Sequence, residues 1–181
     1  MYRADGYRVR TNDAMYELVP YIMPYRYDAS NSVTVDIDLD LMQDYIKKCR
    51  KKGINMSHMS IIIAGALRIA SQNPFLNRFV MNRKIYARNH FCVSFVILKK
   101  RADGTPDETT LKIYLEPQDN IFTINQKIAD TIAKNSAETH NNSTDKFAKM
   151  MFSIPGLPKF VIWLAYHLDK HGLLPRKIVD L

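Results

Sequence analysis

The sequence lacks any run of about 18 consecutive apolar residues, the length that a membrane-spanning helix requires. It has two cysteines, Cys49 and Cys92, too few for a disulfide framework, so we expect two free thiols. The first residues also lack the apolar stretch of a secretory signal peptide. These absences favour a cytoplasmic protein. With 181 residues, 46% of them hydrophobic, the chain is long enough for one domain with a real core.

Acidic residues are scarce relative to basic ones, 18 against 26, which leaves a formal net charge of +8. Such an excess suits an anionic partner such as nucleic acid, lipid headgroups or cofactor phosphates. The densest basic run, Lys47 to Lys52, lies where we expect a helix to end, and a solvated helix end is its favoured explanation. No nucleic-acid-binding motif accompanies it, so we expect no nucleic-acid partner.

The pattern of the first half predicts a strand and two helices. Apolar residues alternate with polar ones from 33 to 38, which is typical of a strand with one buried face. A helix follows, capped by Asp38 or Asp40 and stopped by Gly53. A second helix begins near Ser57 and ends before Pro74, with Ile62 and Leu67 among the residues of its apolar stripe.

The second half predicts strands and a further helix. We expect strands at residues 84–87 and 91–98, then a hairpin loop at Asp103-Gly104 and a partner strand at 109–115. A capping box from Thr123 to Gln126 predicts a helix that continues to about Glu138. Pro20 and Pro24 confine an earlier helix to about residues 13–19.

This order of elements resembles the catalytic domain of 2-oxoacid dehydrogenase acyltransferases and, more distantly, chloramphenicol acetyltransferase. The resemblance spans about Leu18 to Asn135, and its most specific part is Pro74-Phe75-Leu76-Asn77 with the strand that follows it. It implies an α/β fold with a mixed β-sheet flanked by helices. It also implies transfer of an acyl group between coenzyme A and a thiol or hydroxyl acceptor, with coenzyme A (as acyl-coenzyme A) as a substrate and no metal.

The family's catalytic motif, His-x-x-x-Asp-Gly, does not occur in this sequence. The resemblance therefore implies a single partial domain over residues 1–181, incomplete at its C-terminus, with no catalytic residue and no activity by itself. In the family, the strand that matches 91–95 lines the acceptor channel, which makes Phe91, Cys92 and Ser94 candidate channel residues. Plain strand packing is the alternative role for all three.

The resemblance further implies a homotrimer and an acyl acceptor that is either a lipoyl domain or a small molecule. Residues 1–31, rich in tyrosine, would form an extended lead-in that runs along a neighbouring subunit or packs on its own domain. Residues 139–181 would form a hinge and a C-terminal helical segment, with short helices at 146–152 and 159–170.

Three alternatives stay open from the sequence. The chain is an acyltransferase domain, a non-catalytic assembly module on the same scaffold, or a protein that binds anionic surfaces through its charge and last helix. That last helix, at about 18 Å, is too short to span a bilayer, and we expect it to be a core or interface helix. His167 and His171 lie one helical turn apart, a spacing typical of metal ligands, but no partner motif accompanies them and we predict no metal site.

Overall fold

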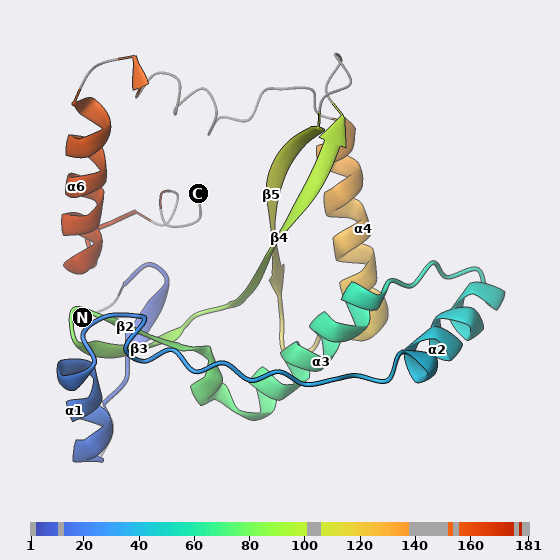
Figure 1. Cartoon of the computed structure of the whole chain (residues 1–181), viewed down its shortest axis with the longest axis horizontal. Helices are drawn as coiled ribbons and strands as arrows, with labels where there is room; N and C mark the ends of the chain where they lie inside the picture. The colour runs from blue at the N-terminus through green and yellow to red at the C-terminus, as the bar shows by residue number, and fades with distance from the viewer. Residues whose placement is uncertain are drawn as a thin grey trace. The chain divides into compact units, whose positions relative to one another are not determined.

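The computed structural model describes residues 3–10, 13–100, 106–137, 152–153, 156–175 and 178. Contacts divide the chain into two compact units (Figure 1): the first comprises Met1–Ser30, Asn77–Asn89 and Thr139–Leu181, and the second comprises Asn31–Leu76 and His90–Glu138. The predicted α/β class is confirmed. The single mixed sheet is wrong, because all strand pairs among the described residues are antiparallel and form two separate sheets.

The first unit contains a three-stranded sheet in the order β1-β3-β2, built from β1 (Gly6–Arg8), β2 (Arg78–Met81) and β3 (Lys84–Arg88). A two-residue turn joins β2 to β3. Asn82 and Arg83 have φ angles of 49° and 57° in this turn, the left-handed conformation that tight hairpins of the I′ type require. Asparagine adopts this conformation readily, whereas arginine does so only under the constraint of the flanking strands.

Helix α1 (Ala14–Ile22) lies against β3 in the same unit. The side chain of Asp13 caps it by accepting a hydrogen bond from the backbone N–H of Met15 at 2.9 Å. The predicted helix is thus confirmed, but the expectation that Pro20 stops it is wrong. Proline removes one helical hydrogen bond, and at Pro20 this loss falls in the last turn, where few bonds remain to be broken.

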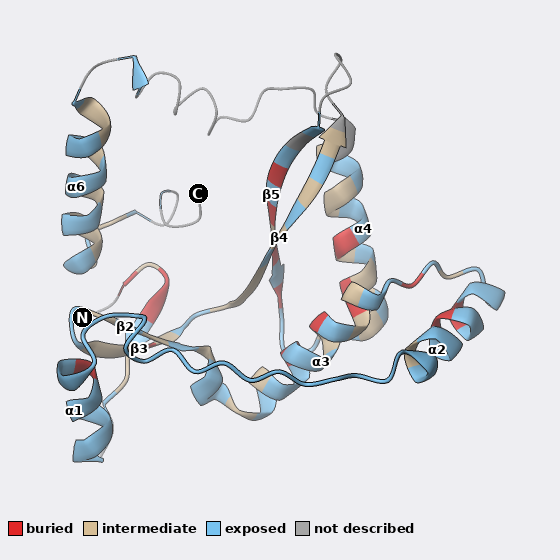
Figure 2. Cartoon of the chain, in the orientation of Figure 1, coloured by how far each residue is buried: buried red, intermediate tan, exposed pale blue. Residues whose placement is uncertain are grey.

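The second unit packs three helices and a hairpin. These are α2 (Leu39–Lys51), α3 (His58–Gln72), the hairpin β4 (Phe91–Lys100) with β5 (Pro106–Leu115), and α4 (Ile121–Ala137). A short 3₁₀ turn, η1 (Pro74–Asn77), follows α3 and leads toward β2. Six aliphatic side chains from α3, β5 and α4 form the core of this unit (Figure 2): Ile63, Leu67, Ile113, Leu115, Ile124 and Ile128.

The start of α4 differs from the prediction. The helix begins at Ile121, and the side-chain oxygen of Asn120 caps it by accepting from the N–H groups of Phe122 at 2.9 Å and Thr123 at 3.0 Å. The capping box that starts at Thr123 is therefore wrong, because an asparagine three residues earlier satisfies the free N–H groups first. The hairpin loop at Asp103-Gly104 lies outside the described residues.

The predicted strand at 33–38 is wrong. No described strand pairs with these residues, and the side chains that alternate there are exposed, Val33 at 80% and Val35 and Ile37 almost as strongly. The alternation of apolar and polar residues shows that a strand here would have one apolar face. A strand also needs a neighbouring strand to form hydrogen bonds with its backbone N–H and C=O groups, and the alternation does not provide one.

The C-terminal predictions are tested only in part. The expected hinge and most of the helix at 146–152 lie outside the described residues. The expected helix at 159–170 is confirmed as α6 (Leu157–Lys170), which belongs to the first unit. None of its residues is buried, so of the two expected roles, core helix or interface helix, the core role is wrong and the interface role stays a prediction.

Candidate functional site

The two faces of the β4–β5 hairpin differ in character. One face packs on the aliphatic core of the second unit through Phe91, Val93 and Phe95, which lie opposite Leu115, Ile113 and Leu111. The other face, which we call the outer face, is formed by the residues between these: Cys92, Ser94, Val96, Lys112 and Tyr114, among others. It combines a thiol, a hydroxyl, an ammonium group and an aromatic ring.

The three candidate channel residues are divided between these faces. Phe91 packs against the core and is placed for strand packing. Cys92 is half-buried opposite Tyr114, and Ser94 is exposed opposite Lys112, so both lie on the outer face. A channel wall at this hairpin would therefore consist of Cys92, Ser94 and their cross-strand partners.

His90 adjoins the outer face at its beginning. Its ring meets the ring of Tyr114 edge-on, with centroids 4.9 Å apart, which is the favourable geometry for two aromatic rings. Tyr114 was not singled out from the sequence, because only the register of β5 against β4 brings it beside Cys92.

A polar network that the sequence did not predict joins the start of α3 to α4. The hydroxyl of Ser60 is completely buried and lies 2.7 Å from the hydroxyl of Ser57 and 2.7 Å from the amide oxygen of Asn125, to which it donates. The Asn125 amide in turn donates to the carbonyl of Asn55 at 3.0 Å. Because each buried polar group is satisfied, we assign this network a structural role.

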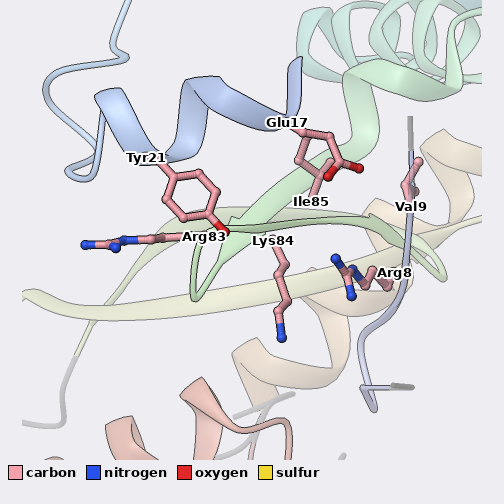
Figure 3. Close-up of a pocket in the computed structure, with 7 residues that line it drawn as sticks. All are labelled: Arg8, Val9, Glu17, Tyr21, Arg83, Lys84 and Ile85. Carbon is pink, nitrogen blue, oxygen red and sulfur yellow. The ribbon is translucent and has the colours of Figure 1, made fainter. Parts of the chain in front are cut away.

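A small pocket in the first unit lies between α1 and the β1–β3 edge (Figure 3). Ile85 of β3 and Val9, the residue after β1, line it on one side, and Glu17 and Tyr21 line it from α1. The guanidinium of Arg83 lies 5.5 Å from the ring centre of Tyr21. Arg8 and Lys84 also line the pocket, and the ammonium end of Lys84 points away from α1.

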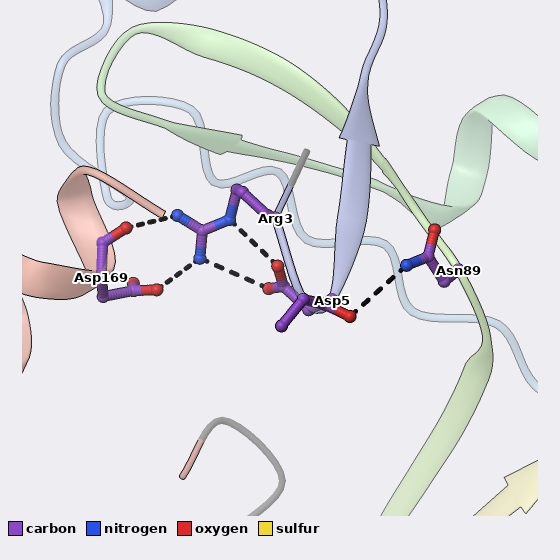
Figure 4. A network of polar contacts seen from close by, with 5 residues as sticks. Arg3, Asp5, Asn89 and Asp169 are labelled. Atoms are coloured by element: carbon purple, nitrogen blue, oxygen red, sulfur yellow. Dashed lines mark hydrogen bonds and ion pairs between the residues drawn. The ribbon is translucent and has the colours of Figure 1, made fainter. Parts of the chain in front are cut away.

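The first unit also holds a buried arginine (Figure 4). The guanidinium of Arg3 donates to the Asp5 carboxylate at 3.0 Å and to both the carboxylate and the backbone carbonyl of Asp169 at the end of α6. Its flat face lies over the rings of Phe79 and Tyr86, at 5.5 and 5.6 Å from their centres. Burial lowers the pKa of Arg3, but the two carboxylates outweigh it and raise the pKa above the ordinary value.

Backbone contacts fix the position of this Arg3 network. Asn89 donates through its backbone N–H to the carbonyl of Asp5 at 3.0 Å and through its side chain to Ala4 at 3.4 Å. Gly6 is the next residue after Asp5, and a Cβ atom at this position would lie 2.4 Å from the Ala87 carbonyl oxygen. Only glycine allows β1 to approach β3 so closely, so Gly6 is required for the pairing of these strands beside the Arg3 network.

The other histidines that the structure describes lie on α3 and just within or after α6. His58 opens α3 at an exposed position. His167 and His171 belong to a row of stacked rings on α6, with their centroids 5.0 Å apart. Within the described ranges, no group of three or more His, Cys, Asp or Glu side chains is arranged to hold a metal ion.

Comparisons with known proteins add no relative: no family model, no curated protein and no solved structure matches this chain. Among the helices that the structure describes, none has both the length and the apolar character needed to cross a bilayer.

Proposed function

We propose that this chain is a domain of a coenzyme-A-dependent acyltransferase and that the outer face of its β4–β5 hairpin lines the cavity where acyl donor or acceptor lies. The observation that supports this is the outer face itself, where Ser94 and Tyr114 are exposed and Cys92 is half-buried, whereas the opposite face packs on the core. Because the sequence has no His-x-x-x-Asp-Gly motif, the proposal assigns no catalytic residue to the chain.

Alkylation of the two thiols tests this proposal. Cys49 is buried and serves as the internal control, whereas Cys92 is half-buried on the outer face. We expect acetyl-coenzyme A, which carries no free thiol, to slow iodoacetamide labelling at Cys92 and to leave Cys49 unchanged, as located by peptide mass spectrometry. Equal labelling rates at Cys92 with and without acetyl-coenzyme A would overturn the proposal.

An activity assay follows from the missing motif. A general base contributes about 10²–10⁴-fold to such a reaction, so we expect the chain alone to show no loss of acetyl-coenzyme A thioester above the uncatalysed rate with a small alcohol or thiol acceptor. Turnover that disappears in His90→Ala or His167→Ala would show that one of these histidines is the base.

A second candidate function, a non-catalytic assembly module, is favoured by the exposed segment at 33–37. Its exposed apolar side chains alternate with polar ones, and no described strand pairs with it. A segment with these two properties is able to pair as an added strand with a sheet of another subunit. On this proposal the chain forms a homo-oligomer, for which the family resemblance suggests a trimer.

Sedimentation velocity tests the oligomer directly. We expect Val33→Ser combined with Val35→Ser to weaken assembly, because both side chains belong to the same face. The matched control, Thr34→Ala combined with Asp36→Asn, changes the other face and should leave assembly intact. A monomer at every accessible concentration contradicts the assembly proposal without bearing on the binding of acetyl-coenzyme A.

A further inference from the structure

Helix α6 has two sides of different exposure. Its inner stripe consists of half-buried residues spaced three and four apart: Leu157, Val161, Ala165, Leu168 and Asp169. Asp169 receives the hydrogen bond from Arg3, so this stripe is the side that faces its own unit. The opposite side, which we call the aromatic face, is exposed.

The aromatic face carries a continuous row of rings. Phe160 and Trp163 are exposed at 56% and 59%, and their ring centroids lie 6.2 Å apart. The row continues from Trp163 to His167 at 5.6 Å and from His167 to His171 at 5.0 Å. A cluster of exposed apolar rings bordered by polar side chains is typical of an interaction site.

Lysines accompany the rings on the same side of the helix. Lys159 and Lys170 are exposed and lie four residues before and seven residues after Trp163, positions that share one helical face. The sequence adds Arg176 and Lys177 shortly after the helix, within a chain of net charge +8. Lys159 and Lys170 therefore share one side of α6 with the aromatic rings.

We infer that the aromatic face of α6 binds an anionic lipid surface, with the helix lying in the headgroup region. Aromatic rings with a polar edge favour this interface, and lysines can extend their ammonium groups to lipid phosphates while their stems stay among the apolar side chains. The central part of a protein–protein interface is depleted in lysine, so this combination fits a lipid surface better than an apolar protein partner. At 14 residues the helix is about 21 Å long, too short to span the apolar layer, but long enough to lie along it.

The charge complementarity predicts a strong dependence on lipid type and salt. Each basic residue near an anionic leaflet contributes on the order of a fivefold gain in binding, and this attraction decays within a Debye length. Binding should therefore be tight to anionic vesicles, weak to zwitterionic ones, and reversed by added salt.

Trp163 is the sole tryptophan of the chain, so its fluorescence reports directly on the aromatic face. We expect a blue shift and co-sedimentation of the full chain with vesicles of equal phosphatidylcholine and phosphatidylserine, and much less of both with phosphatidylcholine alone. Phe160→Ser should weaken binding without removing the reporter. Tyr27→Ser changes an even more exposed ring outside α6 and should not weaken binding.

A pair of double variants separates this face from the charge of the chain as a whole. Lys159→Gln with Lys170→Gln should lower vesicle affinity by about tenfold or more. Lys47→Gln with Lys51→Gln removes the same charge from the exposed basic run on α2 and should have little effect.

Three results would overturn the inference. One is an unchanged spectrum with anionic vesicles. Another is a larger loss from the α2 variants than from the α6 variants. The third is a blue-shifted Trp163 fluorescence spectrum without lipid. A blue shift that depends on protein concentration would mean that a second copy of the chain covers the aromatic face. A blue shift independent of concentration would mean that another part of the same chain covers it.

Discussion

The second unit is held together by aliphatic side chains, whereas the first is held together around a charge. In the second unit, residues such as Ile124 and Leu67 are almost completely removed from water and belong to one cluster of aliphatic side chains. In the first unit, the most buried side chains include Arg3 and Asp5 beside the ring of Tyr86. A three-stranded sheet with short strands has little apolar surface to bury, so hydrogen bonds and ring contacts take a larger share of its stability.

This difference has a consequence for how each unit responds to substitution. An aliphatic core loses stability in proportion to the volume removed. A buried ion network loses it when one partner is removed and the other remains without compensation. Substitutions at Leu67, Arg3 and Lys127 test this difference, from the largest expected effect to the smallest.

Leu67→Ala should destabilise the second unit by about 2–5 kcal/mol, because it leaves a cavity among Ile63, Ile113 and Ile124. Ile62→Ala is the matched control on the same helix. Its side chain is 55% exposed, against 3% for Leu67, so the change should cost much less. Lys51→Ala, at an exposed position of α2, should stay within about 0.5 kcal/mol. Urea denaturation measures all three, and equal losses for Leu67→Ala and Lys51→Ala would contradict the assignment of the core.

Arg3→Met should destabilise the first unit by about 1.5–3 kcal/mol, the range for hydrogen bonds to charged groups, since Asp5 and Asp169 both lose their donor. Hydrogen exchange at the β1 and β3 amides measures the loss in this unit alone. Arg88→Met is the control: its guanidinium lies 4.6 Å from the ring centre of Phe79, a contact worth about 0.5–1 kcal/mol at an exposed site. If protection falls equally in both variants, the Arg3 network is not what holds this unit.

Lys127→Met should make the stability of the second unit less dependent on pH in the acid range. Partial burial raises the pKa of Asp119, but the hydrogen bond from Lys127, the backbone N–H of Glu116 and the charge of Lys127 outweigh it and hold the pKa below its ordinary value. A carboxylate with a lowered pKa stabilises the fold above the unfolded-state pKa of about 4, and this stability is lost as the pH falls below it.

The measurement is the pH dependence of the melting temperature. Removing Lys127 should shrink the decline in stability below about pH 4 relative to neutral pH, since less stability remains to be lost by protonation, and should lower stability at neutral pH. Lys134→Met, later on the same helix, is the control. A pH profile that is unchanged in Lys127→Met would show that Asp119 does not depend on this lysine.

Local features were predictable from the sequence because they depend on neighbours in the chain. Asp38 and Ser57 begin α2 and α3 through short-range hydrogen bonds, and Gly53 follows α2 in the left-handed conformation. The helical stripe of α3 correctly placed Leu67 inside, but it did not distinguish Ile62 from Ile63, which differ by a single position on the helix. At the candidate site, the sequence pointed to the strand that carries Cys92 and Ser94.

Only the tertiary structure decided what depends on partners distant in sequence. The segment at 33–37 has the right alternation for a strand and no described neighbour to pair with. Arg3 is buried because Asp169, 166 residues away, accepts from it. Tyr114 reaches Cys92 through the register of a hairpin. The sequence by itself determined which residues could form helices and strands, since backbone propensity and capping act within a few residues. Which surfaces are covered was decided by long-range packing, because burial is a property of the assembled chain and not of any segment within it.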